Sequence, residues 1–178
     1  MTSGTSFGRM KADAKAAAVD HSRPRVAEPC VNIVLVEPQI PPNTGAIARL
    51  CGAAACPLHI VGPMGFKASD RYLKRAGLDY WDSVDITTYD NLESFIQRHG
   101  DGVLWVTSKR VERRHTDVEF SPGDFVLFGH EIDGLPKELL TEHADHSITI
   151  PILGQVRSHN LACAASIVLY EALRQLRD

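Results

Sequence analysis

Three short segments of this 178-residue chain combine glycine, proline and small polar residues in a way that is typical of ligand-binding turns. They run from Glu37 to Gly45, from Phe128 to Pro136 and from Arg157 to Leu161, and each follows an apolar stretch. Where a strand ends in such a turn before a helix, backbone N–H groups and small side chains point at one small volume. Three turns of this form in one short chain predict a composite binding site.

The contents of these turns favour a neutral or zwitterionic, adenosine-type ligand over a nucleoside triphosphate. The dinucleotide fingerprint GxGxxG does not follow the first apolar run, and the phosphate-binding motif GxxxxGK[ST] is absent. None of the eight histidines has the spacing of a metal-binding motif, so we expect no metal site. No GxSxG nucleophile elbow occurs, and the adjacency of Ser158 and His159 does not place their side chains in triad geometry.

The elements that must position these turns alternate between apolar and amphipathic stretches. The patterns predict strands at 31–36, 58–61, 83–87, 103–107, 125–128 and 147–150, and helices at 44–55, 70–76, 91–99, shortly after 136 and from 157 to 177. The nearly continuous apolar run at 31–36 is typical of a parallel strand that is covered on both faces. Asn43 is the expected N-cap of the first helix. Together these features predict an α/β fold with a mostly parallel sheet flanked by helices.

Residues 1–28 contain almost no bulky apolar side chains, so we expect a mobile N-terminal extension followed by one domain at 29–178. No apolar run is long enough to span a membrane, and no hydrophobic signal segment opens the chain, which favours a cytoplasmic location. The four cysteines lack CxxC spacing, and we expect reduced, mostly buried thiols.

The net charge of −3 means that any RNA-binding surface must be a local patch. Basic side chains recur at i, i+3 and i+4 in the expected helix 70–76, and they gather again in the long charged segment 108–121. They are Arg71, Lys74 and Arg75 in the helix and Arg110, Arg113 and Arg114 in the segment. Such a face is most often simply solvated, and the alternative is that both groups hold RNA phosphates.

Taken together, the motifs resemble the SPOUT superfamily of RNA methyltransferases. The likeness covers residues 31–177 in order and is carried by Asn32–Gly45 with Arg49–Cys51, Pro63–Phe66, Arg75–Tyr80, Phe128–Pro136, Ile150–Ile152 and Arg157–Leu161 with Ile167–Gln175. More narrowly, these motifs resemble small enzymes that methylate the ribose 2′-hydroxyl of the wobble nucleotide of tRNA, a cytidine or a 5-substituted uridine. The resemblance implies the same activity here.

The resemblance also implies a fold, a cofactor and partners. The fold would be of SPOUT type, with a deep C-terminal trefoil knot that no periodicity reveals. S-adenosylmethionine would bind in the knot loops, and a homodimer would build the site for a tRNA anticodon stem-loop. By motif position, the implied cofactor contacts are Val106, Thr107, Gly129, Ile150 and Ser158. The implied catalytic residues are Arg49, Asn43, Glu131, Ser158 and Asn160.

In this interpretation Arg49 is the active-site arginine, and a solvated helix residue is the alternative. A guanidinium with a pKa above about 12 is a poor proton acceptor. We therefore expect Arg49 to clamp the target phosphate while the phosphate or water takes the hydroxyl proton. Structural alternatives stay open for Asn43 as a helix cap, and for Ser158 and Asn160 as helix-start residues. Tyr170 belongs either to the core or to a dimer interface.

Three positions depart from the family pattern. Ala162-Cys163 stands where Ser-Asn is usual, His159 replaces an apolar residue, and Ile132 replaces a small hydroxyl residue. These departures leave two alternatives: a ribose methyltransferase that acts on another tRNA position or on rRNA, and an inert RNA-binding or cofactor-sensing module. Because the implied catalytic residues are all present, we expect catalysis.

Overall fold

The computed structural model describes residues 30–66 and 84–177. In chain order the elements are β1 (Asn32–Val36), α1 (Pro41–Ala54), β2 (Leu58–Val61), β3 (Ile86–Tyr89), α3 (Leu92–His99), β4 (Leu104–Thr107), β5 (Phe125–Phe128), α4 (Lys137–Glu142), a 3₁₀ turn (Ala144–His146), β6 (Ser147–Ile148) and α5 (Leu161–Arg177). The strands form one sheet in the order β3-β2-β1-β5-β4-β6, and every pairing between them is parallel. The predicted α/β class and parallel sheet are confirmed.

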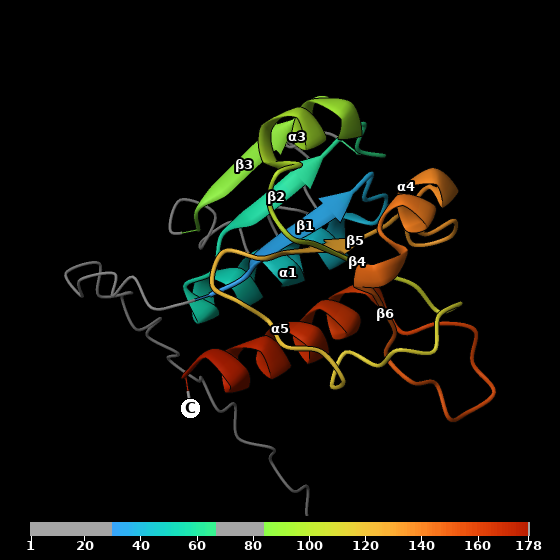
Figure 1. Cartoon of the computed structure of the whole chain (residues 1–178). Helices are drawn as coiled ribbons and strands as arrows, with labels where there is room; N and C mark the ends of the chain where they lie inside the picture. Colours follow the sequence, from blue (N-terminus) through green and yellow to red (C-terminus); the bar gives the residue numbers. More distant parts are fainter. Residues whose placement is uncertain (1–29, 67–83, 178) are drawn as a thin grey trace, which may run out of the picture.

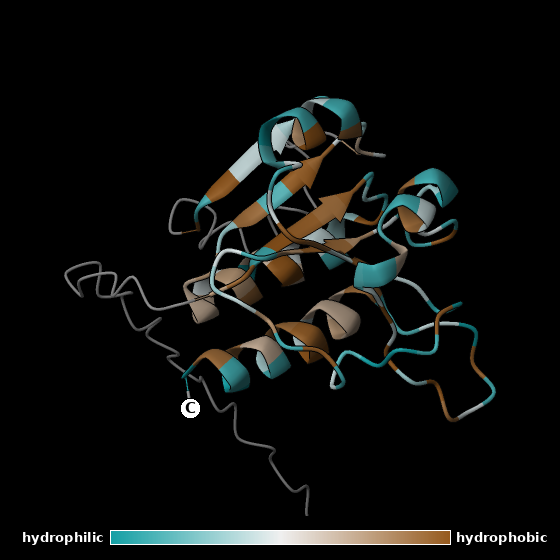
Figure 2. Ribbon diagram, viewed as in Figure 1, coloured by the Kyte–Doolittle hydropathy of each residue, from teal (hydrophilic) through white to brown (hydrophobic). Residues whose placement is uncertain are grey.

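Helices cover the sheet on both faces (Figure 1), with α1 and α5 on one side and α3 and α4 on the other. Successive residues of β1 alternate between the two cores: Ile33 and Leu35 pack with α1 and α5, and Val34 and Val36 pack on the opposite face. This double burial explains why the central strands are almost purely apolar in sequence. Figure 2 shows the same division, with apolar strands inside and polar residues on the outer helix faces.

Two of the helices that border the predicted turns, α1 and α5, begin elsewhere than expected. Helix α1 starts at Pro41 and has Ile40 at its N-cap position, so the prediction that Asn43 caps a helix from Thr44 is wrong. Proline suits the first helical position because its missing N–H has no partner there anyway. Helix α5 starts at Leu161, four residues later than predicted.

The prediction of four reduced thiols is also wrong, because Cys30 and Cys56 form a disulfide with their Cα atoms 5.8 Å apart. Cys30 precedes β1 and Cys56 precedes β2, and the parallel register of these neighbouring strands brings the two residues together. Cys51 is a buried thiol whose pKa is raised to about 12 by burial, and Cys163 is exposed. The pairing arises from sheet register, which the spacing of cysteines in the sequence does not reveal.

Two other predictions concern residues that the structure does not describe. The expected helix at 70–76 and the N-terminal extension 1–28 lie outside the residues that the structure describes. Among residues 30–66 and 84–177, no helix combines the length and apolar character that a bilayer crossing requires. The knot stays a prediction from the resemblance.

Candidate active site

All three predicted turns meet at one cavity of about 610 Å³. Its walls come from the segments that follow β1, β4, β5 and β6, and from the segment that enters α5. The carboxyl ends of parallel strands share one edge of a sheet, and ligands of open α/β sheets bind there. The volume lies in the range of about 300–1,000 Å³ that is usual for small-molecule sites.

Glu131 joins the second turn to the first. One carboxylate oxygen, Oε2, accepts a hydrogen bond from the Gln39 N–H at 2.9 Å. The other, Oε1, accepts from the Ile40 N–H and from Asn43 Nδ2, each at 3.1 Å. The carboxylate therefore satisfies backbone donors at the entry to α1, where negative charge is also favoured by the helix dipole.

Asn160 joins the third turn to this pair. Its Nδ2 donates to Asn43 Oδ1 at 2.9 Å, and its own Oδ1 accepts from the Ala162 N–H at 2.9 Å, which caps α5. Asn43 is buried, with only 7% of it exposed, and both ends of its amide have a partner: its Nδ2 donates to Glu131, and its Oδ1 accepts from Asn160. Asn43, Glu131 and Asn160, the cavity cluster below, thus hold the three turns against one another.

Gly129 permits the second turn to close on itself. A Cβ atom at this position would overlap the backbone of Gly134 and Leu135. Gly134 has φ of +79°, a conformation that glycine adopts without steric cost, and its N–H donates to the His130 carbonyl at 2.8 Å. The two glycines fix the shape of this cavity wall.

A protein-family model, the SpoU rRNA Methylase family, matches residues 30–170. The chain belongs to this family. It is 44% identical over 146 residues to a tRNA (cytidine(34)-2′-O)-methyltransferase from Saccharophagus degradans, covering 82% of this chain and 95% of the relative. A solved structure described as giving insights into 2-OH methylation of C/U34 on tRNA aligns with a TM-score of 0.79 and 40% identity, covering 84% of this chain and 92% of the other.

A second solved structure is an AdoMet-bound rRNA methyltransferase from Sinorhizobium meliloti. It aligns with a TM-score of 0.75 and 28% identity, covering 86% of this chain and 60% of that one. S-adenosylmethionine is thus the cofactor of structurally similar family members.

This cavity of the SpoU-family chain brings together most of the residues that were predicted from the sequence as catalytic or cofactor-binding. Its lining includes Asn43, Thr107, Gly129, Glu131, Ile150, Ser158 and Asn160. The side chain of Val106 lies instead in the core beneath α3 and α4, fully buried. Arg49 is exposed on α1 and is not part of the cavity lining. Six residues separate it from Asn43, or about 9 Å along the helix axis.

The candidate RNA contacts are only partly visible. Arg113 and Arg114 are exposed on the segment that follows β4, and Arg113 donates to the Asp145 carbonyl oxygen. Arg71, Lys74 and Arg75 lie outside the described residues. Sequence reasoning missed three cations of the cavity wall, Lys109, Lys137 and Arg157. Their signal was available, since each lies within or directly beside a segment already identified.

The cavity residues fit S-adenosylmethionine. Ile150 and Ile152 line the cavity, and their N–H groups make no hydrogen bond to any residue between 30–66 or 84–177. Backbone donors beside apolar side chains suit an adenine ring, which is flat and has acceptor nitrogens at its edge. Ser158 is exposed at the same wall and adds a hydroxyl that is free of protein partners within the described chain. Among all residues that the structure describes, no group of three or more side chains of His, Cys, Asp or Glu could hold a metal ion.

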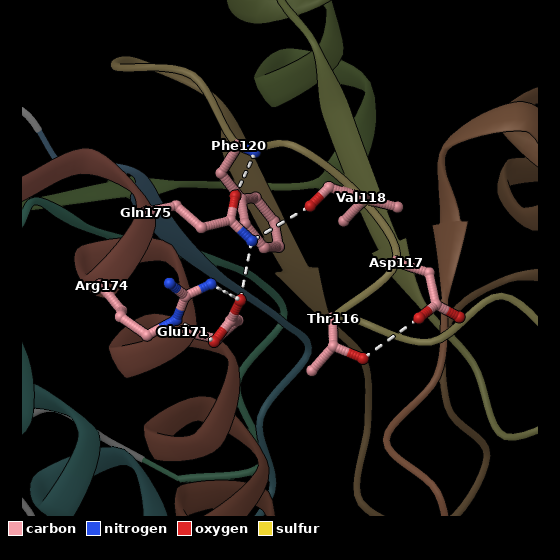
Figure 3. A network of polar contacts seen from close by, with 7 residues as sticks. All are labelled: Thr116, Asp117, Val118, Phe120, Glu171, Arg174 and Gln175. Atoms are coloured by element: carbon pink, nitrogen blue, oxygen red, sulfur yellow. Dashed lines mark hydrogen bonds and ion pairs between the residues drawn. The ribbon is translucent and has the colours of Figure 1, made fainter. Parts of the chain in front are cut away.

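The segment between β4 and β5 is anchored to the C-terminal part of α5, through residues that do not line the cavity (Figure 3). Gln175 accepts from the Phe120 N–H at 2.9 Å and donates to the Val118 carbonyl at 3.0 Å. Arg174 grips Glu171 through two hydrogen bonds of 3.0 and 2.9 Å, and Gln175 also donates to Glu171. These hydrogen bonds, first from Arg174, lower the pKa of Glu171 to about 2. The anchor fixes one end of the segment that carries the basic side chains.

Proposed function

We propose that this chain transfers a methyl group from S-adenosylmethionine to the ribose 2′-hydroxyl of the wobble nucleotide of tRNA. The observation that carries the proposal is the convergence of three polar turns on one cavity through the cavity cluster. The similarity to tRNA (cytidine(34)-2′-O)-methyltransferases over four fifths of the chain supports the substrate. From the proposed role in tRNA modification we infer a cytoplasmic location.

The charge around the cavity suits an RNA substrate. Lys109, Arg110 and Arg157 line its wall, and Arg113 and Arg114 are exposed farther along the segment after β4. Cations that contact phosphates position an RNA without reading its sequence. In a chain of net charge −3, this local patch directs the anticodon stem-loop to the cavity.

The side chains around the cavity act mainly by positioning. When bound, S-adenosylmethionine supplies a methyl group on a positively charged sulfur atom. Glu131, Asn43 and Asn160 spend their hydrogen bonds on one another and on the backbone, so they hold the turns and do not move the hydroxyl proton. Arg49 clamps the phosphate beside the target ribose, because an arginine remains charged and cannot serve as the base. Orientation alone can supply a large part of such a rate enhancement.

A homodimer explains where Arg49 and several apolar side chains lie. Arg49 is outside the cavity of its own chain, so a site that uses it is completed by a second copy. On α5, Ile167 is 38% exposed and Tyr170 is 56% exposed, which places Tyr170 outside the core. Leu153 is 99% exposed beside the cavity. In the proposed homodimer the second copy covers these exposed apolar side chains.

Calorimetry with S-adenosylmethionine and transfer of a labelled methyl group to purified tRNA and rRNA test the proposal. We expect stoichiometric binding, label in tRNA, and a 2′-O-methylated nucleoside at the wobble position by mass spectrometry. Label in rRNA alone identifies an rRNA enzyme, and cofactor binding without transfer identifies an inert module. Either result overturns the proposal.

Arg49→Ala tests the clamp in the same assay. We expect turnover to fall by about 10²–10³-fold, as for loss of one group that stabilises a transition state. Cofactor affinity should stay within a few-fold. Equal losses of turnover and of cofactor affinity contradict the clamp.

A further inference from the structure

The turn from His130 to Gly134 presents two largely exposed side chains at the cavity. Ile132 is 82% exposed, and the side chain of Asp133 is also 82% exposed. Both residues line the cavity. Neither belongs to the core. Within the described chain the Asp133 carboxylate accepts no hydrogen bond, and its Oδ2 lies 3.7 Å from His130 Nδ1.

This turn is rigid although its tip is exposed. His130 Nδ1 accepts hydrogen bonds from the backbone N–H groups of Ile132 at 3.0 Å and Asp133 at 3.3 Å. Because Nδ1 is an acceptor, the imidazole proton resides on Nε2. Glu131, between these residues, is tied to the entry of α1 through three donors. The backbone of Ile132 and Asp133 is therefore held in place before a substrate arrives, which lowers the entropy cost of binding.

An apolar side chain beside a carboxylate suits a nucleobase better than a phosphate. An isoleucine can cover the face of a pyrimidine, and an ionised aspartate only accepts hydrogen bonds. Cytosine carries an exocyclic amine that donates to Asp or Glu, whereas uracil has a carbonyl oxygen at that position. The cations Lys109, Arg110 and Arg157 on the same cavity are the groups for phosphates.

We propose that Ile132 and Asp133 read the base of the target nucleotide. Ile132 packs against the ring, and the Asp133 carboxylate accepts a hydrogen bond from the exocyclic amine of cytosine, so that cytidine is preferred over uridine. His130 is a positioning residue that acts through its Nδ1 on the backbone of both. The inference rests on the proposed function and extends it to base selection.

The experiment uses two anticodon stem-loop RNAs that differ only in cytidine or uridine at the target position. Methyl transfer gives kcat/KM for each RNA, and fluorescence anisotropy gives the Kd of each for the full-length protein. Asp133→Asn should lower the cytidine-to-uridine ratio in both measurements by about fivefold, the lower end of the range for one base contact. Asp101→Asn, an exposed acid on the loop before β4, is the matched control and should keep the wild-type ratio.

Ile132→Ser should raise KM and Kd for both RNAs by about five- to tenfold, as expected for loss of an apolar base contact. Cofactor affinity by calorimetry should not change. Val103→Ser, at a 40% exposed position before β4, is the control for loss of a surface apolar side chain. Sedimentation of the Ile132→Ser protein addresses the rival occupant, a second copy. A shift to monomer with unchanged RNA affinity overturns the assignment to the base.

The role of His130 is tested by a pair of variants. His130→Asn places an amide oxygen near the position of Nδ1 and should retain the cytidine preference, whereas His130→Ala should lose it. An unchanged ratio in Asp133→Asn, or the same loss in both His130 variants, overturns the inference. If the wild-type protein methylates neither RNA, the proposed function fails, and the anisotropy ratio still decides whether Asp133 discriminates the two bases.

Discussion

Two clusters of hydrogen-bonded polar residues join distant segments of this molecule. They differ in what surrounds them. The cavity cluster borders the ligand site, and a second group, the ring cluster, consists of His59, Tyr89 and His99 packed against Phe95 and Phe125. Both satisfy their members by hydrogen bonds between elements. The first borders a cavity of about 610 Å³, whereas the second is packed among aromatic rings. A polar network is therefore a site candidate because of the space that it borders, and hydrogen bonding alone does not distinguish the two.

Hydrogen bonds of the ring cluster run in one direction. Asn32 Nδ2 donates to the Gly123 carbonyl, so its Oδ1 accepts from His59 Nε2–H. His59 Nδ1 then accepts from the Tyr89 hydroxyl, whose oxygen accepts from His99 Nε2–H. His59 is 7% exposed, and burial, followed by the neighbouring His99, lowers its pKa to about 4. This cluster is built around neutral imidazole.

The largest effect on the cavity side should come from Gly129→Ala. The new methyl group would overlap the backbone of Gly134, and we expect a loss of unfolding free energy of roughly 3 kcal/mol or more together with loss of cofactor binding. Urea unfolding and calorimetry measure these quantities. Gly154→Ala is the control for stability, since a Cβ there meets no atom within 4 Å. Equal stability of the two variants would show that the turn can relax.

On the ring side, acid should destabilise the protein. The pKa of His59 is about 4 in the folded chain, below the ordinary histidine value of 6.5, so the folded state binds fewer protons between these pH values. The contribution of neutral His59 to the free energy of unfolding is fully present above pH 6.5 and decreases as the pH falls. By pH 4 about 3 kcal/mol of it is lost. Asp85, which raises this pKa, and Arg98, which lowers it, also face the group.

Urea midpoints measured between pH 7 and pH 4 test this prediction. His59→Phe should remove most of the slope, leaving the smaller contribution of His99, whose pKa is also lowered by burial. Methyl transfer at pH 7 should be unaffected by His59→Phe if the ring cluster has no part in catalysis. A large loss of turnover in a stable variant would remove the distinction between the clusters.

Glu131→Gln addresses what the cavity cluster does. A glutamine keeps the volume of the side chain but replaces one acceptor oxygen with a donor, which leaves a backbone N–H at the entry to α1 without a partner. We expect a loss of about 2 kcal/mol of unfolding free energy and a fall in turnover that accompanies it. Asp101→Asn supplies the control for loss of a surface charge. Turnover that collapses while the urea midpoint is unchanged would make Glu131 a substrate-contacting residue.

Sequence patterns predicted the parts of the fold that depend on local burial. The strands at 58–61 and 125–128 match β2 and β5 to the residue, because each is buried on both faces. Strand β3 runs from Ile86 to Tyr89, later than predicted, and its threonines and partial exposure gave a weaker pattern. The start of α1 was predicted wrongly because Asn43 resembles a helix cap in the local sequence. In the structure, the backbone N–H groups of Gln39 and Ile40 at the entry to α1 donate instead to the carboxylate of Glu131.

Long-range pairing accounts for what local patterns did not reveal. Asn43 lies 88 residues from Glu131 and 117 from Asn160 in sequence, so their mutual bonds could not be read from spacing. The resemblance supplied these residues as catalytic, and the structure supplies the hydrogen bonds that favour a positioning role. The disulfide and the place of Arg49 outside the cavity likewise depend on how elements pack.

The smallest effect is expected from Arg174→Ala in the anchor at the C-terminal end of α5. The Arg174 side chain is 60% exposed, so its pair with Glu171 should contribute less than about 1 kcal/mol at neutral pH. The same change removes the first cause of the low pKa of Glu171, which should rise from about 2 toward the ordinary glutamate value of 4.5. Nuclear magnetic resonance titration of the Glu171 carboxyl measures this shift.

A group with a depressed pKa stabilises the fold at pH values above its pKa in the unfolded chain, and this contribution is lost as the pH falls. Wild type and variant should therefore differ in stability at pH 7 and converge toward pH 2. A pKa that stays near 2 in Arg174→Ala would assign the shift to Gln175, and with it the anchoring of the basic segment.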